Sequence, residues 1–184
     1  FLKDFTTGSP RRIYYSEEKP DITQTPLPRW DLINMSYYAS MSLQYSRGCP
    51  YDCEFCDIVK LNGRRPRVKS SEQMIREFNI LYDMGWRGRC FIVDDNFIGN
   101  KFKVKQLLRD LIPWQQKRNF PFTLFTEASV NLAEDHELMR LMTEAGFDSV
   151  FLGLETPAEE CLLECGKHQN TAKDLVEAVK TIQR

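Results

Sequence analysis

The chain of 184 residues carries 25 Lys and Arg against 26 Asp and Glu, which gives a formal net charge of −1. This near balance argues against a general nucleic-acid or membrane-surface binder, because such proteins need a clear excess of basic residues. The 42% hydrophobic content is enough for a packed core and excludes wholesale disorder. No apolar run approaches the ~18 residues of a membrane span, and the charged first residues do not resemble a secretory signal. We therefore expect a cytoplasmic protein.

Residues 1–38 are predicted to form an extended arm. Prolines at positions 10, 20, 26 and 28 interrupt any helix in this segment. Trp30 and the apolar residues after it are expected to dock the arm against the rest of the chain. Because the chain also begins with Phe1 instead of Met, we expect the arm to be a linker that follows a domain absent from this sequence.

From residue 39 onward, predicted strands alternate with predicted helices. The strands cover residues 40–46, 90–93, 122–126 and 149–154. Five helices are predicted. The first begins at a capping box at residues 70–73, and the fourth begins at a second capping box at residues 156–159. The other three cover residues 103–117, 137–144 and 172–182. Pro113 is expected to kink or end its helix early.

This alternation predicts an α/β fold with a parallel sheet and right-handed crossovers. In such sheets the functional groups gather at the carboxyl ends of the strands. Here those ends are followed by a cysteine-rich loop at residues 46–56, by residues 94–96, by residues 127–129 and by Glu155.

Three of the six cysteines, Cys49, Cys53 and Cys56, fall within eight residues. Three thiolates can hold three corners of a cubane iron–sulfur cluster, whereas a cluster held entirely by protein takes four. An open coordination position is typical of a catalytic metal site. Two alternatives remain: a structural zinc site, or an electron-transfer cluster with a distant fourth cysteine. Either one would make the chain a non-catalytic module.

The other cysteines carry weaker signals. Cys90 begins a buried strand and is expected to be a small core residue. Cys161 and Cys165 are four residues apart, with His168 three residues further on, so a second metal site on one helix face stays open.

The motif Cys49-x-x-x-Cys53-x-x-Cys56, with aromatic Phe55 before the last cysteine, resembles the radical S-adenosylmethionine (radical SAM) enzyme family. Segments 45–50, 94–100, 126–131 and 153–157 resemble the branch that is usually fused to an amino-terminal cobalamin-binding domain. The resemblance covers nearly all of residues 22–184. It implies a [4Fe–4S] cluster on the three cysteines and S-adenosylmethionine on the remaining iron. Electron transfer to the sulfonium would then release a 5′-deoxyadenosyl radical that abstracts hydrogen from a substrate.

The resemblance also implies cofactor contacts at the strand ends. Asp94 or Asp95, with Asn96, occupies the place of the turn that binds the methionine ammonium group in much of the family. Glu127, Ser129 and Glu155 would contact the ribose and the methionine end, and Phe55 would pack over the cluster near the adenine. No residue is assigned to the chemical step on the substrate.

Family members close their core with six βα units, so the resemblance implies a partial (β/α) barrel of about four units. Residues 39–184 would be a radical SAM core that is truncated on its carboxyl-terminal side. The expected partners are a small-molecule or lipid substrate, a reductant such as flavodoxin or ferredoxin, and a cobalamin domain in the parent chain. Cobalamin-dependent methylation is an implication of this branch of the family.

Overall fold

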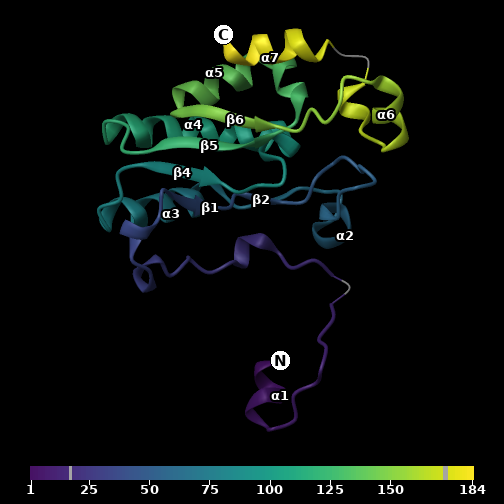
Figure 1. Cartoon of the computed structure of the whole chain (residues 1–184). Coiled ribbons are helices and arrows are strands. Elements are labelled where there is room, and N and C mark those ends of the chain that lie inside the picture. The colour runs from purple at the N-terminus through teal and green to yellow at the C-terminus, as the bar shows by residue number, and fades with distance from the viewer. Residues whose placement is uncertain (17, 172–173) are drawn as a thin grey trace.

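A sheet of four parallel strands, in the order β1-β4-β5-β6, organises the fold (Figure 1). The computed structural model describes residues 1–16, 18–171 and 174–184. The strands are β1 (Ser40–Leu43), β4 (Arg89–Ile92), β5 (Thr123–Ala128) and β6 (Phe147–Leu152). The predicted α/β class and parallel sheet are thus confirmed, and within the described residues the sheet stays open instead of closing into a barrel.

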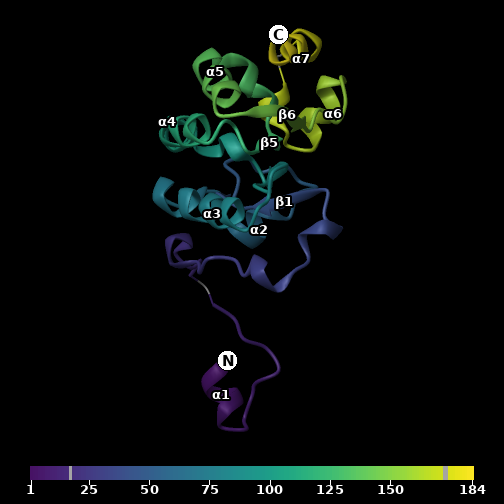
Figure 2. The same cartoon turned by 90° about the vertical axis from the view of Figure 1, so that its left-hand side faces the viewer.

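Three long helices return the chain from one strand to the next. They are α3 (Ser71–Asp83), α4 (Lys101–Lys117) and α5 (His136–Glu144), and Figure 2 shows them along the same side of the sheet. Strand side chains alternate between the two faces, so every second residue points at these helices. The resulting core contains the fully buried side chains of Leu43, Met74, Phe78, Cys90, Leu108, Leu124 and Leu138, among others. Cys90 is the core residue that the sequence predicts.

Short elements complete the chain around the carboxyl ends of the strands. An antiparallel ribbon of β2 (Ser46–Arg47) and β3 (Arg67–Val68) encloses the cysteine loop and the short helix α2 (Ile58–Asn62). After β6 come α6 (Glu159–Glu164), the 3₁₀ turn η6 (His168–Asn170) and α7 (Leu175–Gln183).

Several predicted boundaries are wrong. The strand predicted over residues 40–46 breaks after Leu43, because the next residues leave the central sheet and pair with β3 instead. Strand β6 lies two residues earlier than predicted at both its ends. The start of the last predicted helix, at Ala172, lies outside the described residues.

Pro113 does not end its helix, since α4 continues to Lys117. Beyond the proline, Trp114 and Gln115 are buried. The amide of Gln115 donates hydrogen bonds to the carbonyls of Phe122 and Ala145, at 2.9 and 3.0 Å. This tertiary packing offsets the ~3 kcal/mol that an interior proline costs a helix.

The capping box predicted at residues 156–159 is also wrong. Helix α6 begins at Glu159, and its N-cap residue Ala158 provides no side-chain hydrogen bond. The hydroxyl of Thr156 instead accepts a hydrogen bond from the Ala158 amide at 3.1 Å, which stabilises a local turn ahead of the helix. The capping box of α3 is present, with Ser70 and Gln73 bonded to each other's backbone.

The amino-terminal arm runs away from the sheet and ends in α1 (Leu2–Thr6), far from the other helices (Figure 1). Nearer the sheet, Ile22 and Trp30 are buried, at 3% and 7% exposure. Trp30 thus docks the arm against the core as expected, while the role of residues 1–38 as an interdomain linker stays a prediction. Among the described helices, none is long and apolar enough to cross a membrane.

A buried ion pair fixes the ribbon that flanks the cysteine loop to α3. The Lys69 ammonium lies 2.5 Å from the Glu77 carboxylate, and the two side chains are 4% and 1% exposed. Burial raises the pKa of Glu77, and the neighbouring Lys69 partly offsets this rise. The backbone amide of Lys69 also donates to the Tyr45 carbonyl at 2.9 Å. The pair therefore connects the chain on either side of the cysteine loop to the helical layer.

We expect Lys69→Met to lower the free energy of unfolding by about 3–5 kcal/mol, because it leaves the Glu77 carboxylate buried without a cation. Urea denaturation measures this change. Replacing both residues, as in Lys69→Met with Glu77→Leu, should recover most of the loss. Arg140→Ala, which breaks the exposed Arg140–Glu144 pair, serves as the control and should have little effect. A Lys69→Met protein as stable as the wild type would contradict this account.

Candidate functional site

The cysteine loop lies between β2 and α2 and turns sharply at its first residues. Gly48 has φ +106°, and a Cβ atom at this position would lie 2.7 Å from the Gly63 carbonyl oxygen. Only glycine fits there without displacing backbone. The amide of Cys49 donates to the same carbonyl at 3.3 Å. The loop therefore starts in a defined direction, close to the end of α2.

The loop and the ends of β4, β5 and β6 surround one hollow of about 210 Å³. Its lining includes every predicted site residue except Asp94: Cys49, Cys53, Phe55, Cys56, Asp95, Asn96, Glu127, Ser129 and Glu155. It also includes Tyr51, Ala128, Phe151, Gly153, Lys167 and Gln169, which the sequence analysis does not single out. Residues from five separate parts of the chain thus meet at one edge of the sheet.

Asp94 does not line the hollow and is 1% exposed. Its carboxylate accepts hydrogen bonds from the backbone amides of Tyr45 and Ser46, both at 2.8 Å, and from the Ser46 hydroxyl at 2.7 Å. Burial raises the pKa of Asp94 to about 6. Its contacts join the end of β1 and the start of β2 to the end of β4, which fixes the base of the cysteine loop.

Asp95 turns the other way and lines the hollow. Its Oδ2 atom accepts long hydrogen bonds from the Gly48 amide at 3.2 Å and from the Asn62 side chain at 3.3 Å. The two adjacent aspartates therefore divide their roles: the structure buries one under the loop and presents the other to the hollow.

Asn96 connects the cysteine loop to the end of β5. Its Nδ2 atom lies 3.9 Å from the Cys49 sulfur and 3.1 Å from the Ser129 hydroxyl. Ser129 donates in turn to Asn131 at 2.6 Å, and Asn131 donates to the Tyr51 hydroxyl at 2.8 Å. This chain of hydrogen bonds returns to the cysteine loop and so fixes Asn96 and Ser129 at the rim of the hollow.

Glu155 has φ +65°, a left-handed conformation that is strained for a residue other than glycine. Its carboxylate forms an ion pair with Lys167 at 2.7 Å. A Cβ atom on Gly153 would lie 2.8 Å from the Glu155 carboxylate and 2.9 Å from the Lys167 ammonium. Glycine at position 153 therefore leaves the space that this ion pair occupies.

The remaining predicted residues are more open to solvent. Phe55 is 60% exposed, and its ring centroid lies 5.4 Å from the Lys167 ammonium. Glu127 lines the hollow, and both burial and the charge of Asp95 raise its pKa. The hollow thus combines three carboxylates, at Asp95, Glu127 and Glu155, with the single ammonium group of Lys167 among its lining residues.

Residues 165–170, which we call the return segment, pack against the cysteine loop. The Cys165 carbonyl accepts a hydrogen bond from the Glu54 amide at 2.8 Å. The Gln169 amide nitrogen lies 3.4 Å from the Cys53 sulfur. Sequence patterns miss these contacts because Lys167 and Gln169 belong to no recognisable motif. The one local signal is Gly166, a residue able to adopt the φ of +69° seen there.

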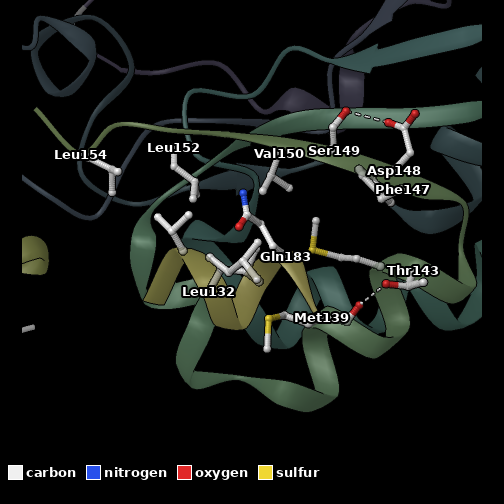
Figure 3. Close-up of a pocket in the computed structure, with 13 residues that line it drawn as sticks. Leu132, Met139, Thr143, Phe147, Asp148, Ser149, Val150, Leu152, Leu154 and Gln183 are labelled. Carbon is white, nitrogen blue, oxygen red and sulfur yellow. Dashed lines mark hydrogen bonds between the residues drawn. The ribbon is translucent and has the colours of Figure 1, made fainter. Parts of the chain in front are cut away.

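A larger cavity of about 530 Å³ lies between β6, α5 and α7 (Figure 3). Its walls are mostly apolar, with Leu132, Met139, Val150 and Leu152 among the lining side chains. The hydroxyl of Thr143 donates to the Met139 carbonyl at 3.1 Å, so it is already engaged. None of the cysteines of the loop and none of the strand-end carboxylates reaches this cavity, so it is separate from the hollow at the strand ends.

The donors around the smaller hollow fit an iron–sulfur cluster. Cys49, Cys53 and Cys56 are free thiols, and side-chain amides approach two of their sulfurs. Hydrogen bonds to sulfur are a usual feature of such centres. Within the described residues, no three His, Cys, Asp or Glu side chains converge as ligands of a single metal ion. That finding covers Cys161, which is exposed, together with Cys165 and His168.

Comparison with known proteins points to one family. The model of the Radical SAM superfamily matches residues 43–184. An uncharacterised methyltransferase of Synechocystis is 53% identical over 99% of the chain, and the hopanoid C-2 methylase of Rhodopseudomonas palustris is 41% identical over 97%. The chain spans 34% of the length of each of these relatives.

Two solved structures show the same fold. The cobalamin-dependent S-adenosylmethionine radical enzyme OxsB superposes with a TM-score of 0.76 at 20% identity, over 98% of this chain and 30% of that one. The radical S-adenosylmethionine methyltransferase TsrM of Kitasatospora setae gives a TM-score of 0.69 at 20% identity, over 80% of this chain and 29% of that one. Given the family match and the 53% identical relative, the chain belongs to the radical SAM superfamily.

Proposed function

We propose that this chain carries the cluster and S-adenosylmethionine site of a cobalamin-dependent radical SAM methylase. The observation that carries the proposal is the convergence of Cys49, Cys53 and Cys56 with the carboxylates of three strand ends around one hollow. A thiol loop alone would suit many metal sites. A thiol loop beside a rim of carboxylates suits a metal centre that also binds a cationic organic ligand.

The three cysteines would hold three irons of a [4Fe–4S] cluster and leave the fourth iron for S-adenosylmethionine. When bound, such a cluster supplies the electron that cleaves S-adenosylmethionine to methionine and a 5′-deoxyadenosyl radical. The chain's own residues place the ligands: Gly48 permits the tight turn at the start of the loop, and Asp94 holds the loop to the sheet.

The charges around the hollow favour S-adenosylmethionine, which has a sulfonium and an ammonium group. Asp95 and Glu127 are unpaired with any cation among the lining residues, and their mutual repulsion contributes to the raised pKa of Glu127. A cationic ligand would relieve this repulsion. We propose that Asp95, supported by Asn96, binds the ammonium group, and that Glu127, Ser129 and Phe55 contact the nucleoside.

Lys167 is proposed to bind the methionine carboxylate. The negative charge of Glu155 would repel the methionine carboxylate. The Lys167 ammonium group, which lies 2.7 Å from Glu155, can instead donate charge-assisted hydrogen bonds to that carboxylate. The Lys167 side chain is only 10% exposed, so its charge is weakly screened by solvent. In this arrangement Glu155 orients Lys167.

The relatives support methylation as the net reaction. Several of them are named as methylases or methyltransferases, and the structures of TsrM and OxsB were obtained with cobalamin bound. We propose that cobalamin is held by a separate domain of the parent protein, that the reductant is a flavodoxin or ferredoxin, and that the substrate is a small molecule or a lipid. The alternative is a non-catalytic iron–sulfur or zinc module, which would have no use for the carboxylate rim.

Anaerobic reconstitution with iron and sulfide should give the intact protein about four irons per chain. With dithionite and S-adenosylmethionine, this protein should then form 5′-deoxyadenosine, measured by chromatography. Cys53→Ala should abolish the product because it removes one of three cluster ligands. Cys161→Ala, at an exposed thiol outside the hollow, is the matched control and should stay active. A colourless protein that retains zinc would refute the enzyme proposal.

The adjacent aspartates allow a second test. Asp95→Asn should weaken S-adenosylmethionine binding about tenfold, or ~1.4 kcal/mol, while stability is preserved because the amide oxygen can still accept from Gly48. Asp94→Asn should instead lower the free energy of unfolding by about 1–3 kcal/mol, since its new NH₂ group would face the Ser46 amide. Anaerobic equilibrium dialysis and urea denaturation measure the two effects. If a stable Asp94→Asn protein lost as much affinity for S-adenosylmethionine as Asp95→Asn, the assignment of the ammonium contact to Asp95 would be wrong.

Replacing Lys167 tests the carboxylate contact. Lys167→Met should weaken S-adenosylmethionine binding by about tenfold, or ~1.4 kcal/mol, whereas Lys167→Arg should keep most of the affinity because it keeps the charge. The same dialysis experiment measures both variants, with iron content as the check on cluster occupancy. If Lys167→Met binds as tightly as the wild type, the carboxylate lies elsewhere.

A further inference from the structure

We infer that Gln169 is a positioning residue that donates a hydrogen bond to the Cys53 sulfur and raises the reduction potential of the cluster. This inference rests on the proposed function, since it needs a cluster on Cys53. Gln169 and Cys53 are 116 positions apart in the sequence, so only the fold brings the two side chains together.

The geometry brings the amide directly to the sulfur. The Nε2 atom of Gln169 lies 3.4 Å from the Sγ atom of Cys53, and Cys53 is 9% exposed. The corresponding Asn96–Cys49 contact, at 3.9 Å, is longer and therefore weaker. Gln169 is thus the closer of the two side-chain donors to the ligating sulfurs.

Contacts of the neighbouring residues hold the backbone around Gln169 in place. The next residue, Asn170, is 2% exposed, and its side-chain amide donates hydrogen bonds to the backbone carbonyls of Gly153 and Leu154 at 2.9 and 3.1 Å. On the other side, Lys167 is fixed by Glu155, and the Cys165 carbonyl accepts from Glu54. Turn η6 is therefore bonded to the chain just after β6, and this fixes the backbone from which the Gln169 side chain reaches the Cys53 sulfur.

The electrostatic consequence follows from the charge of the cluster. Reduction adds one electron to the [4Fe–4S]²⁺ state to give [4Fe–4S]⁺, with dithionite or a flavodoxin-type protein as the donor and with no bond made or broken. The added negative charge is shared with the cysteine sulfurs, and an N–H dipole aimed at a sulfur stabilises it. The hydrogen bond therefore favours the reduced state and raises the potential.

The test compares three variants of the intact, reconstituted protein. Gln169→Leu removes the N–H donor, Gln169→Glu replaces it with an acceptor of the same shape, and His168→Ala alters an exposed neighbour on the same turn. A redox titration followed by electron paramagnetic resonance measures the potential. We expect the ratio of reduced to oxidised cluster at a fixed potential to fall about tenfold in Gln169→Leu, equivalent to about 59 mV. It should fall further in Gln169→Glu and stay unchanged in His168→Ala.

A second readout needs no variant. Wild-type protein labelled with ¹⁵N in its glutamine side chains should show a ¹⁵N coupling to the reduced cluster in pulsed electron paramagnetic resonance. A structural role for Gln169 without the N–H···S bond would not produce this coupling.

The outcomes separate the inference from the proposed function. Absence of the coupling, or a potential in Gln169→Leu or Gln169→Glu equal to that of His168→Ala, would overturn the inference and leave the cluster assignment intact. A wild-type protein that takes up no cluster would overturn the proposed function, and the inference with it.

Discussion

The carboxylate of Asp94 joins two parts of the chain that are far apart in sequence. It accepts both backbone amides at the start of the cysteine loop and the Ser46 hydroxyl, from a position at the end of β4. Without a common acceptor, the buried amides of Tyr45 and Ser46 would lack partners, which is costly inside a protein. The loop therefore leaves the sheet in a fixed direction, and the place of all three thiols depends on it. The raised pKa of Asp94, about 6, is the electrostatic cost of this buried position.

Around this fixed point, the hollow has an uneven charge. Three carboxylates and three thiols face one ammonium group among its lining residues. Such an arrangement is unfavourable in a protein that binds nothing there, because the negative charges of neighbouring carboxylates repel one another in a partly buried space. It becomes favourable when positive iron and a cationic ligand are bound. The electrostatics of the site and its proposed ligands are therefore complementary.

Much of the architecture can be predicted from local sequence patterns. The four strands, the capping box of α3 and the buried Cys90 follow from periodicity and from short-range hydrogen bonding. The strand-end residues come together because parallel strands end at one edge of a sheet.

Other features depend on contacts that no local pattern encodes. Pro113 is tolerated because the residues beyond it are buried and bonded to distant carbonyls. Lys167 and Gln169 reach the hollow only because the return segment packs against the cysteine loop. Which of the two adjacent aspartates faces inward also depends on the three-dimensional path of the loop.

The return segment has a consequence for the order of events during synthesis. Cys53 and Gln169 are 116 residues apart in the chain. At translation rates of about 5–20 residues per second, the cysteine loop emerges roughly 6 to 23 s before the residues that cover it. During this interval the contacts from Glu54 to Cys165 and from Cys53 to Gln169 cannot form. The cysteine loop is therefore uncovered early and covered late, so the topology of the chain sets when its thiols become enclosed.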